Sequence, residues 1–425
     1  MPREMKDSGI EGIGQIPTHW EIRKVKNYYT MQTGFTPDTK NESYYDDING
    51  YDWINISDIQ DGKIITDTKK KISQHYIDTY APKIIPQGSL LYSFKLSVGQ
   101  TAYAGKPIYS NEAIASFLPA ENVNLHYLRY SSMFIIENAQ TNIYNAKILN
   151  QDLINNAFIV FPPLNEQEAI ADFLDTKCAE IDAVIAKTQA TIEEYKKLKQ
   201  SVITEAVTKG IRGNRPMKDS GIEWIGEIPA DWDVVRIKTL FDYRNERNEK
   251  PLEEVNLISL YTDLGVVQHC DLESTTGNKA TNADGYKLVY ENDIVVNIIL
   301  CWMGAIGRSA YTGVTSPAYD VYSPKEGTNS KFYHHLFRTQ GFSGDCYKVG
   351  RGIMAMRWRT YSDQFRTIKV VAPPKEEQEE IIEYLDQKCA EIDTLIAKKT
   401  ALLEEMETYK KSVIYEYVTG KKEIV

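Results

Sequence analysis

The sequence predicts an α+β protein in which two mixed α/β domains are joined by two long antiparallel coiled-coil helices, with a pseudo-two-fold relation between its halves. Two internal repeats predict this architecture. The phrase "MKDSGIEGIGQIPTHW" (5–20) returns as "MKDSGIEWIGEIPADW" (217–232) in a chain of 425 residues. The segment 161–187 returns without gaps at 372–398. Because internal repeats mark repeated units of structure, we expect two half-molecules in one polypeptide.

Two inserts, roughly 27–157 and 239–368, separate the repeated segments and show no obvious likeness to each other. The chain is therefore a duplicated frame that carries two different inserts. The predicted division is a first α/β domain at 1–160, a long helix at 161–210, a second α/β domain at 211–371 and a second long helix at 372–425.

Each long helix is predicted from a heptad pattern that neither proline nor glycine interrupts, over 164–209 and 375–419. Pro-Pro precedes each helix, and Gly210 or Gly420 follows it, as expected at helix ends. Lys177 and Lys388 are placed at a positions, where they either fix the register or extend their amines to solvent. The apolar residues assigned to the a and d positions are Ile170, Leu174, Ile181, Val184, Tyr195, Leu198 and Val202, and in the second copy Ile381, Leu385, Ile392, Leu395, Leu402, Met406, Tyr409 and Val413.

The direction of the helices follows from the chain order. The first helix ends at "KGIRGNRP" (209–216), which leads into the second insert, and the second helix leaves that insert through Pro373-Pro374. The second helix must then begin near the end of the first and return along it, so the pair is antiparallel.

Both inserts are predicted to be mixed α/β. Alternating β-branched and aromatic residues indicate strands in 51–59, 88–99 and 100–110 of the first insert, and in 255–261, 293–300 and 365–374 of the second. Short helices are expected at 124–140 and 329–342, in similar places. The two inserts are therefore expected to share a fold despite unlike sequences.

The net charge of −10 appears unsuited to a nucleic-acid partner, but the two long helices account for −9 of it. The inserts are free to present local basic patches. The start of the chain lacks the apolar core of a signal peptide, and no apolar run is long enough to span a bilayer. We expect a cytoplasmic protein without a membrane partner.

Catalytic motifs are not apparent in the sequence. It contains neither GxGxxG after a strand nor a GxxxxGK[ST] phosphate loop. An ExK triplet, Glu194-Tyr195-Lys196, lies on a predicted coiled-coil helix, where a solvated charged face is expected. His269-Cys270, and His334-His335 with Cys346, match no standard metal-ligand spacing. We expect no metal site and no catalytic residues.

Basic and aromatic residues in the inserts suggest contacts to DNA instead. "TKKKIS" (68–73) has three consecutive lysines that could neutralise phosphates, and "GRGIMAMRWRT" (350–360) places three arginines beside Trp358. The candidate DNA-binding residues are Lys69, Lys70, Lys71, Ser93 and Lys95 in the first insert, and Asn297, Trp302, Arg351, Arg357 and Arg359 in the second.

The repeated opening phrase, the "PP…EQE.I…LD.K…ID" start of each helix and the two-insert layout resemble the specificity subunit of type I restriction-modification enzymes. The resemblance covers nearly the whole chain. "YENDIVVNIILCWMGAIGRSAYTGVTSPAY" and "GRGIMAMRWRT" resemble one variety of target-recognition domain, and "YDWINISDIQDGKI" with "GSLLYSFKLSVG" resembles another.

The resemblance implies that each insert is a target-recognition domain that reads one half of a bipartite site in double-stranded DNA. It implies that the helices set the spacing and dock two methyltransferase subunits, and that motor-nuclease subunits join for restriction. It also implies a non-catalytic chain without its own cofactor, with S-adenosylmethionine, ATP and Mg²⁺ on the partner subunits. A coiled-coil scaffold that binds only proteins, and a nuclease with an unrecognised site, remain the alternatives.

Overall fold

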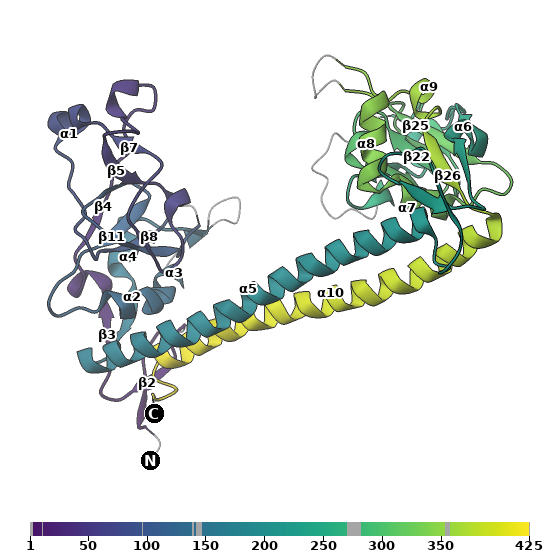
Figure 1. Cartoon of the computed structure of the whole chain (residues 1–425). Coiled ribbons are helices and arrows are strands. Elements are labelled where there is room, and N and C mark those ends of the chain that lie inside the picture. The colour runs from purple at the N-terminus through teal and green to yellow at the C-terminus, as the bar shows by residue number, and fades with distance from the viewer. Residues whose placement is uncertain are drawn as a thin grey trace. The chain divides into compact units, whose positions relative to one another are not determined.

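The computed structural model describes residues 3–10, 12–95, 97–137, 140–141, 147–269, 282–352 and 358–424. Its internal contacts divide the chain into two compact units, one of residues 1–187 with 402–425 and the other of residues 188–401 (Figure 1). Each unit thus contains one insert and about half of each long helix. A contact-based division does not separate the helices from the inserts, because each insert packs against its own stretch of the helix pair.

The two long helices are confirmed. Helix α5 runs from Leu164 to Lys209 and α10 from Lys375 to Val418. At their starts, the side-chain amides of Gln167 and Gln378 donate hydrogen bonds of 2.8 Å to the carbonyl groups of Pro162 and Pro373.

Glycines end both helices as predicted. Gly210 and Gly420 have φ angles of 75° and 69°. This left-handed conformation is strained for residues with a Cβ atom, so glycine suits the residue that follows a helix.

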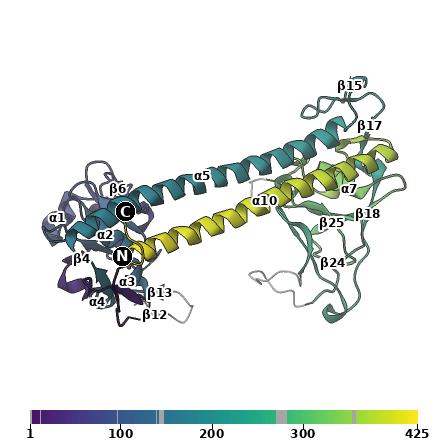
Figure 2. The same ribbon diagram turned by 90° about the horizontal axis from the view of Figure 1, so that it is seen from below.

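The helices are antiparallel in both units (Figure 2). In the first unit the Lys410 amine lies 2.7 Å from the Asp182 carboxylate, and in the second the Lys199 amine lies 2.6 Å from that of Asp393. Asp182 and Asp393 occupy equivalent places in the repeat, as do Lys199 and Lys410. The same ion pair is therefore formed twice. Such exposed pairs contribute little stability, but their repetition is what antiparallel, two-fold-related helices require.

Two rows of residues on each helix were predicted to face the opposite helix, and together they form the seam. One row agrees with the prediction, and the other is shifted by one residue along the chain. The row of Leu174, Ile181 and Thr188 is buried, as predicted, but its companion row holds Cys178 and Ile192. In the predicted companion row Ile170 is buried, but the row is wrong further along, because Val184 and Leu198 are 46% and 48% exposed. The second helix shows the same shift, with Leu395 and Tyr409 exposed.

This shift also changes which lysines lie at the seam. Lys177 and Lys388 lie outside it and pair with Glu180 and Glu391, one turn along their own helices. A register role for these two lysines is therefore not supported. Lys199 and Lys410 occupy the seam row instead, and each reaches across to the opposite helix.

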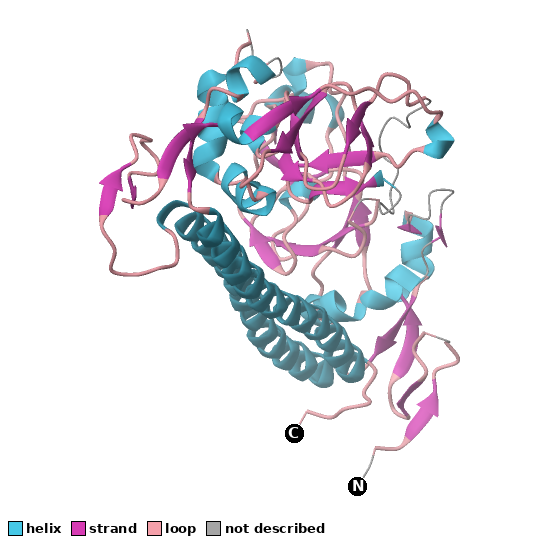
Figure 3. Cartoon of the chain, turned by 90° about the vertical axis from the view of Figure 1, so that its right-hand side faces the viewer, coloured by secondary structure: helices cyan, strands magenta, loops and turns pink. Residues whose placement is uncertain are grey.

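The first unit is built on a five-stranded sheet in the order β4-β11-β8-β9-β6. Figure 3 distinguishes strands, helices and loops by colour. Its strands are β4 (Met31–Thr33), β11 (Ile114–Phe117), β8 (Leu90–Ser93), β9 (Thr101–Ala104) and β6 (Lys63–Ile65). A second sheet contains β10 (Tyr109–Ser110), β5 (Tyr51–Ile54) and β7 (Lys71–Ile72). The helices are α1 (Gln74–Tyr80), α2 (Leu125–Ser131), α3 (Met133–Glu137) and α4 (Gln151–Asn156).

The second unit is built on a four-stranded sheet in the order β18-β25-β22-β23. These strands are β18 (Phe241–Arg244), β25 (Tyr319–Pro324), β22 (Ile294–Asn297) and β23 (Ile306–Arg308). Two-stranded sheets pair β19 (Ile258–Tyr261) with β20 (Gly265–Gln268), and β21 (Lys287–Val289) with β24 (Gly313–Thr315). The helices are α6 (Ile237–Leu240), α7 (Ser330–Phe337), α8 (Gln340–Val349) and α9 (Ser362–Phe365).

The two inserts share the same central sheet. In both, the strand that follows the frame (β4 or β18) pairs antiparallel with a late strand (β11 or β25). That late strand pairs with a middle strand (β8 or β22), and the middle strand pairs with the strand that follows it in sequence (β9 or β23). The units differ in what is added around this sheet. The second sheet and α1 are added in the first unit, and α8 with the β19–β20 pair in the second.

The repeated phrase forms the same hairpin in both copies. β1 (Met5–Asp7) pairs with β2 (Gln15–Pro17), and β15 (Met217–Asp219) with β16 (Glu227–Pro229), in the same register. The strand that follows each hairpin pairs with the strand before the long helix. These pairs are β3 (Glu21–Lys24) with β14 (Phe158–Phe161), and β17 (Asp233–Arg236) with β26 (Lys369–Ala372).

A polar cluster, buried in the second copy and partly buried in the first, holds each hairpin to the first turn of a long helix. In the second copy the Glu377 carboxylate, which is fully buried, accepts hydrogen bonds from the Trp232 indole (2.9 Å) and the Arg215 guanidinium (2.9 Å). In the first copy Glu166 accepts from Trp20 and Arg3 in the same way. Burial raises the pKa of Glu166, but hydrogen bonds from His19 and Trp20 and the charge of Arg3 outweigh it, so the pKa is lowered.

Replacing Glu377 by alanine is expected to lower the free energy of unfolding by about 3–5 kcal/mol, because the Arg215 guanidinium would be left buried without its partner. The matched control is Glu376→Ala, one residue earlier in the same turn, where the side chain is exposed and the expected loss is less than about 1 kcal/mol. Denaturant unfolding followed by circular dichroism measures both. Equal losses in the two variants would contradict a structural role for the cluster.

Among the described helices, none combines the length and the apolar character needed to cross a lipid bilayer.

Candidate nucleic-acid interface

Candidate residues predicted separately in the two inserts lie at equivalent strand ends of the shared central sheet. Ser93 ends β8 opposite Ile114 of β11, and Asn297 ends β22 opposite Tyr319 of β25. The turns that follow lead to β9 and β23 and contain Lys95 and Trp302, respectively. Both turns include a glycine with a positive φ angle, 92° at Gly99 and 90° at Gly304. We call these the β8–β9 turn (94–100) and the β22–β23 turn (298–305).

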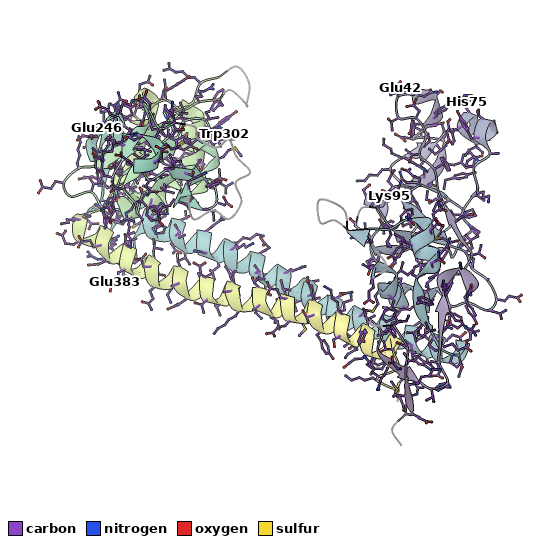
Figure 4. All side chains as sticks on the ribbon, turned by 180° about the vertical axis from the view of Figure 1, so that it is seen from behind. Glu42, His75, Lys95, Glu246, Trp302 and Glu383 are labelled. Atoms are coloured by element: carbon purple, nitrogen blue, oxygen red, sulfur yellow. The ribbon has the colours of Figure 1, made fainter. Side chains whose placement is uncertain are left out.

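In the β8–β9 turn, exposure separates the two candidates. Ser93 has no exposed surface, so the structure does not support a direct contact between this hydroxyl and DNA. The sequence pattern missed this because β8 is covered on both faces, and alternation then no longer marks an outward side chain. The Lys95 side chain is 48% exposed and its amine lies 3.5 Å from the Glu112 carboxylate (Figure 4). Lys95 remains a candidate.

The three consecutive lysines belong to a different part of the first unit. Lys69 and Lys70 are exposed in the segment before β7, and Lys71 begins that strand. The Lys70 amine lies over the Tyr45 ring, 5.5 Å from its centroid. This part of the unit also carries α1, with His75, and lies at the end farthest from the long helices (Figure 4).

The three lysines differ in how far their charges are already neutralised. The Lys71 amine lies 3.2 Å from Asp67 and 3.6 Å from Asp52. The hydrogen bond to Asp67 and the charge of Asp52 raise the pKa of Lys71. Lys69 and Lys70 therefore suit a phosphate contact better than Lys71 does.

In the second unit, Asn297 shapes the turn rather than the surface. It is 6% exposed, and its side-chain oxygen accepts hydrogen bonds from the backbone N–H groups of Ile299 (3.0 Å) and Leu300 (3.3 Å). The Trp302 indole donates to the Ile299 carbonyl group at 2.9 Å. A direct base contact from Asn297 is not supported. Trp302 remains at the surface with its ring partly exposed (Figure 4).

The arginine-rich segment lies next to this turn. Arg351 and Arg359 exchange backbone hydrogen bonds of 2.8 and 2.9 Å, and the Thr360 N–H donates to the Ile298 carbonyl group at the end of β22. The Arg351 side chain is 71% exposed, with its guanidinium 4.0 Å from Asp363. Arg359 is partly buried, and Arg357 lies outside the described residues. Two of the three predicted arginines therefore lie beside the β22–β23 turn.

Three further residues belong to this surface but were not predicted. Leu300, Met303 and Tyr347 are 38%, 54% and 49% exposed. The Tyr347 ring stacks on Trp358 and contacts the edge of Trp302, at centroid distances of 4.9 and 5.7 Å. No local pattern marks Tyr347, because the contact joins α8 to a turn more than 40 residues earlier in the chain. The sequence signals for this cluster were the predicted Trp302 and the segment around Trp358.

The histidines considered as metal ligands have structural surroundings instead. The His334 ring accepts a hydrogen bond from the Arg308 N–H at 3.1 Å. Burial lowers the pKa of His334 to about 3 and that of His335 to about 4, so both are neutral at pH 7. Within the described ranges no three His, Cys, Asp or Glu side chains form a group that could hold a metal ion, and Cys270 lies outside those ranges.

Buried ion pairs account for other basic residues of the second unit. The Lys287 amine lies 2.7 Å from Asp320, and the Arg244 guanidinium lies 3.0 Å from Asp293. Burial raises the pKa of Asp293, although the Tyr290 N–H and Arg244 act in the opposite direction. These charges join β21 to β25, and β18 to the residue before β22, and they are not presented to a partner.

Comparison with known proteins finds relatives along nearly the whole chain. The family model of the type I restriction modification DNA specificity domain matches twice, at residues 17–194 and 229–405. A putative type I restriction enzyme MjaX specificity subunit from Methanocaldococcus jannaschii is 27% identical over 96% of this chain and 95% of its own. The EcoBI specificity subunit from Escherichia coli is 21% identical over 99% of this chain and 90% of its own.

Solved structures show the same fold. A chain from a study of complex assembly and conformational transition of the type I R-M system aligns with a TM-score of 0.68 at 14% identity, over 95% of this chain and 98% of that one. The HsdS subunit from Thermoanaerobacter tengcongensis aligns with a TM-score of 0.51 at 16% identity, over 96% and 98%. With its repeated frame and two matched domains, this chain belongs to the type I restriction-modification DNA specificity family.

Proposed function

We propose that the chain is the sequence-specific DNA-binding subunit of a type I restriction-modification complex, in which each insert reads one half of a bipartite site in double-stranded DNA. The observation that carries the proposal is the double match to the DNA specificity domain, one copy for each insert. The β8–β9 turn and the β22–β23 turn support the proposal, because they follow equivalent strands and would face equivalent parts of the two half-sites. Different side chains on those turns, Lys95 in one and Trp302 in the other, would read different bases.

The long helices are proposed to set the spacing between the half-sites and to dock two methyltransferase subunits. Their acidity supports this division, since the frame helices would repel DNA phosphates, whereas the exposed lysines and arginines of the inserts would attract them locally. Motor-nuclease subunits would join the complex for restriction. S-adenosylmethionine, ATP and Mg²⁺ would bind on the partner subunits, and this chain would contribute recognition without catalysis.

The function is tested by mapping methylated adenines in a genome that expresses this chain together with its methyltransferase partners. We expect one bipartite motif, with two specified halves and an unspecified centre. The purified chain alone, incubated with plasmid, Mg²⁺ and S-adenosylmethionine, is expected neither to cut nor to methylate DNA. Metal-dependent cleavage by the pure chain would favour the nuclease alternative, and absence of DNA binding even with the methyltransferase subunits would favour the protein scaffold.

A further inference from the structure

The β22–β23 turn of the second unit presents an apolar surface that the general function does not explain. It consists of Leu300, Trp302, Met303, Tyr347 and Trp358, which we call the turn patch. Leu300 and Met303 are 38% and 54% exposed, although leucine and methionine are usually buried. The three aromatic rings are continuous, since Tyr347 contacts both tryptophans. Exposed apolar side chains gathered in this way indicate a binding surface.

Both indole N–H groups of the turn patch bond to the backbone of the same unit. The Trp302 indole donates to the Ile299 carbonyl group, and the Trp358 indole donates to that of Tyr347 at 3.1 Å. The side-chain oxygen of Asn297 is occupied by two backbone N–H groups of the same turn. The patch therefore offers mainly carbon surface to a ligand, which suits an apolar group better than the hydrogen-bonding edge of a base.

The turn patch is also held in place from behind. The thiols of Cys301, in the turn, and Cys346, in α8, are fully buried beneath it, and the Thr360 hydroxyl donates to the Cys346 carbonyl group at 2.9 Å. From the frame side, the Trp224 indole donates to Asp345 of α8 at 2.6 Å. A patch fixed in this way needs little reorganisation on binding, which favours discrimination of a small group.

Cationic side chains border the turn patch. Arg351 follows α8 and is 71% exposed, with Asp363 4.0 Å from its guanidinium. Lys348, in the last turn of α8, is 61% exposed, and its amine lies 3.3 Å from Glu223 and 3.9 Å from Asp345. Exposed cationic side chains beside a carbon surface suit DNA, where phosphates border the groove. In the major groove, the apolar group that each A·T pair presents is the C5 methyl group of thymine.

We propose that the turn patch contacts the C5 methyl group of a thymine in the half-site read by the second insert. Leu300 and Met303 would make the contact, and the aromatic rings would support them. This inference rests on the proposed function, because it assumes that the second insert binds a DNA half-site. It adds the chemical group that is recognised and the side chains that recognise it.

The test replaces thymine by deoxyuridine, which removes the methyl group and keeps every base-pair hydrogen bond. Duplexes that contain the mapped motif carry deoxyuridine at one thymine position at a time in the half-site read by the second insert. Dissociation constants for the complex of the chain with its methyltransferase subunits are measured by fluorescence anisotropy. We expect at least one replacement to weaken binding about fourfold, the value of one buried methyl group. The same replacements in the other half-site serve as the control.

A double variant, Leu300→Ala with Met303→Ala, is expected to bind the thymine and deoxyuridine duplexes equally. If this variant does not fold, the comparison of the two duplexes with the unaltered chain still decides the question. Specific binding of the motif that no deoxyuridine replacement weakens, or a half-site without thymine, would overturn this inference and leave the proposed function intact. Absence of specific binding to the motif would instead overturn the proposed function.

Discussion

Exchange of residues 27–157 for the insert of a related specificity subunit is expected to change one half of the methylated motif and to leave the other half unchanged. The physical reason is that the two inserts belong to separate compact units, each with its own core. The base contacts of one insert then do not depend on the other. Sequencing that detects methylated adenine in cells that express the chimaera and its partners gives the result directly.

The contacts between insert and frame define which exchanges will fold. The Tyr127 hydroxyl, from the insert, lies 3.1 Å from the Val160 carbonyl oxygen and 3.2 Å from that of Val418, and its proton is shared between these acceptors. The Tyr130 hydroxyl donates to Asp175 of α5 at 2.6 Å. A donor insert that keeps both tyrosines preserves these bonds. The reciprocal exchange of 239–368 is the matched control and should change only the other half of the motif. A change in both halves after either exchange would contradict the assignment of one insert to one half-site.

Trp224 makes the second exchange the more demanding of the two. It belongs to the frame but bonds to Asp345 of the insert, whereas the equivalent position of the first copy is Gly12. A donor for the second insert therefore needs a carboxylate in the place of Asp345. Without it, the partly buried indole N–H would lose its partner.

A seven-residue insertion into both long helices is expected to lengthen the unspecified centre of the motif while both half-sites persist. The insertions follow Thr188 and Lys399, which are equivalent in the repeat and lie on the same row of the seam. Seven residues preserve the observed seam rows, since the heptad returns after two turns. Each helix would grow by roughly 10 Å at ~1.5 Å per residue, or about 3 base pairs of duplex.

Insertions of three or four residues at the same positions are the controls. They rotate the seam away from the opposite helix and are expected to abolish activity rather than to change the spacing. The longer helix pair also turns each insert around the axis of the DNA, so a lower affinity can accompany the longer spacing. A well-folded, active seven-residue double insertion with an unchanged spacing would show that the helices dock partners but do not measure the distance.

The architecture could be predicted from the sequence because the repeated segments mark its two halves. Two copies of one frame, each with a proline-delimited helix, are visible without any structure, and both helices lie where their patterns place them. The phase of the seam was less accessible, since apolar residues stand next to each other at 170–171 and 184–185. Either neighbour could face the opposite helix by pattern alone. Only packing showed that Cys178 and Ile192 are buried while Val184 is exposed.

The candidate site was also predicted in part from the sequence and decided in part by the tertiary structure. The sequence alone pointed to the turns after β8 and β22 and to the arginines near Trp358, because such residues cluster in short segments. The tertiary structure decided which of them face outward. Ser93 and Asn297 are almost fully buried, in strands that pair with β11 and β25 from later in the chain. Tyr347 lies on the same surface as Trp302 because α8 packs against the β22–β23 turn. Local patterns record the periodicity of a segment, but exposure depends on which other segments pack against it.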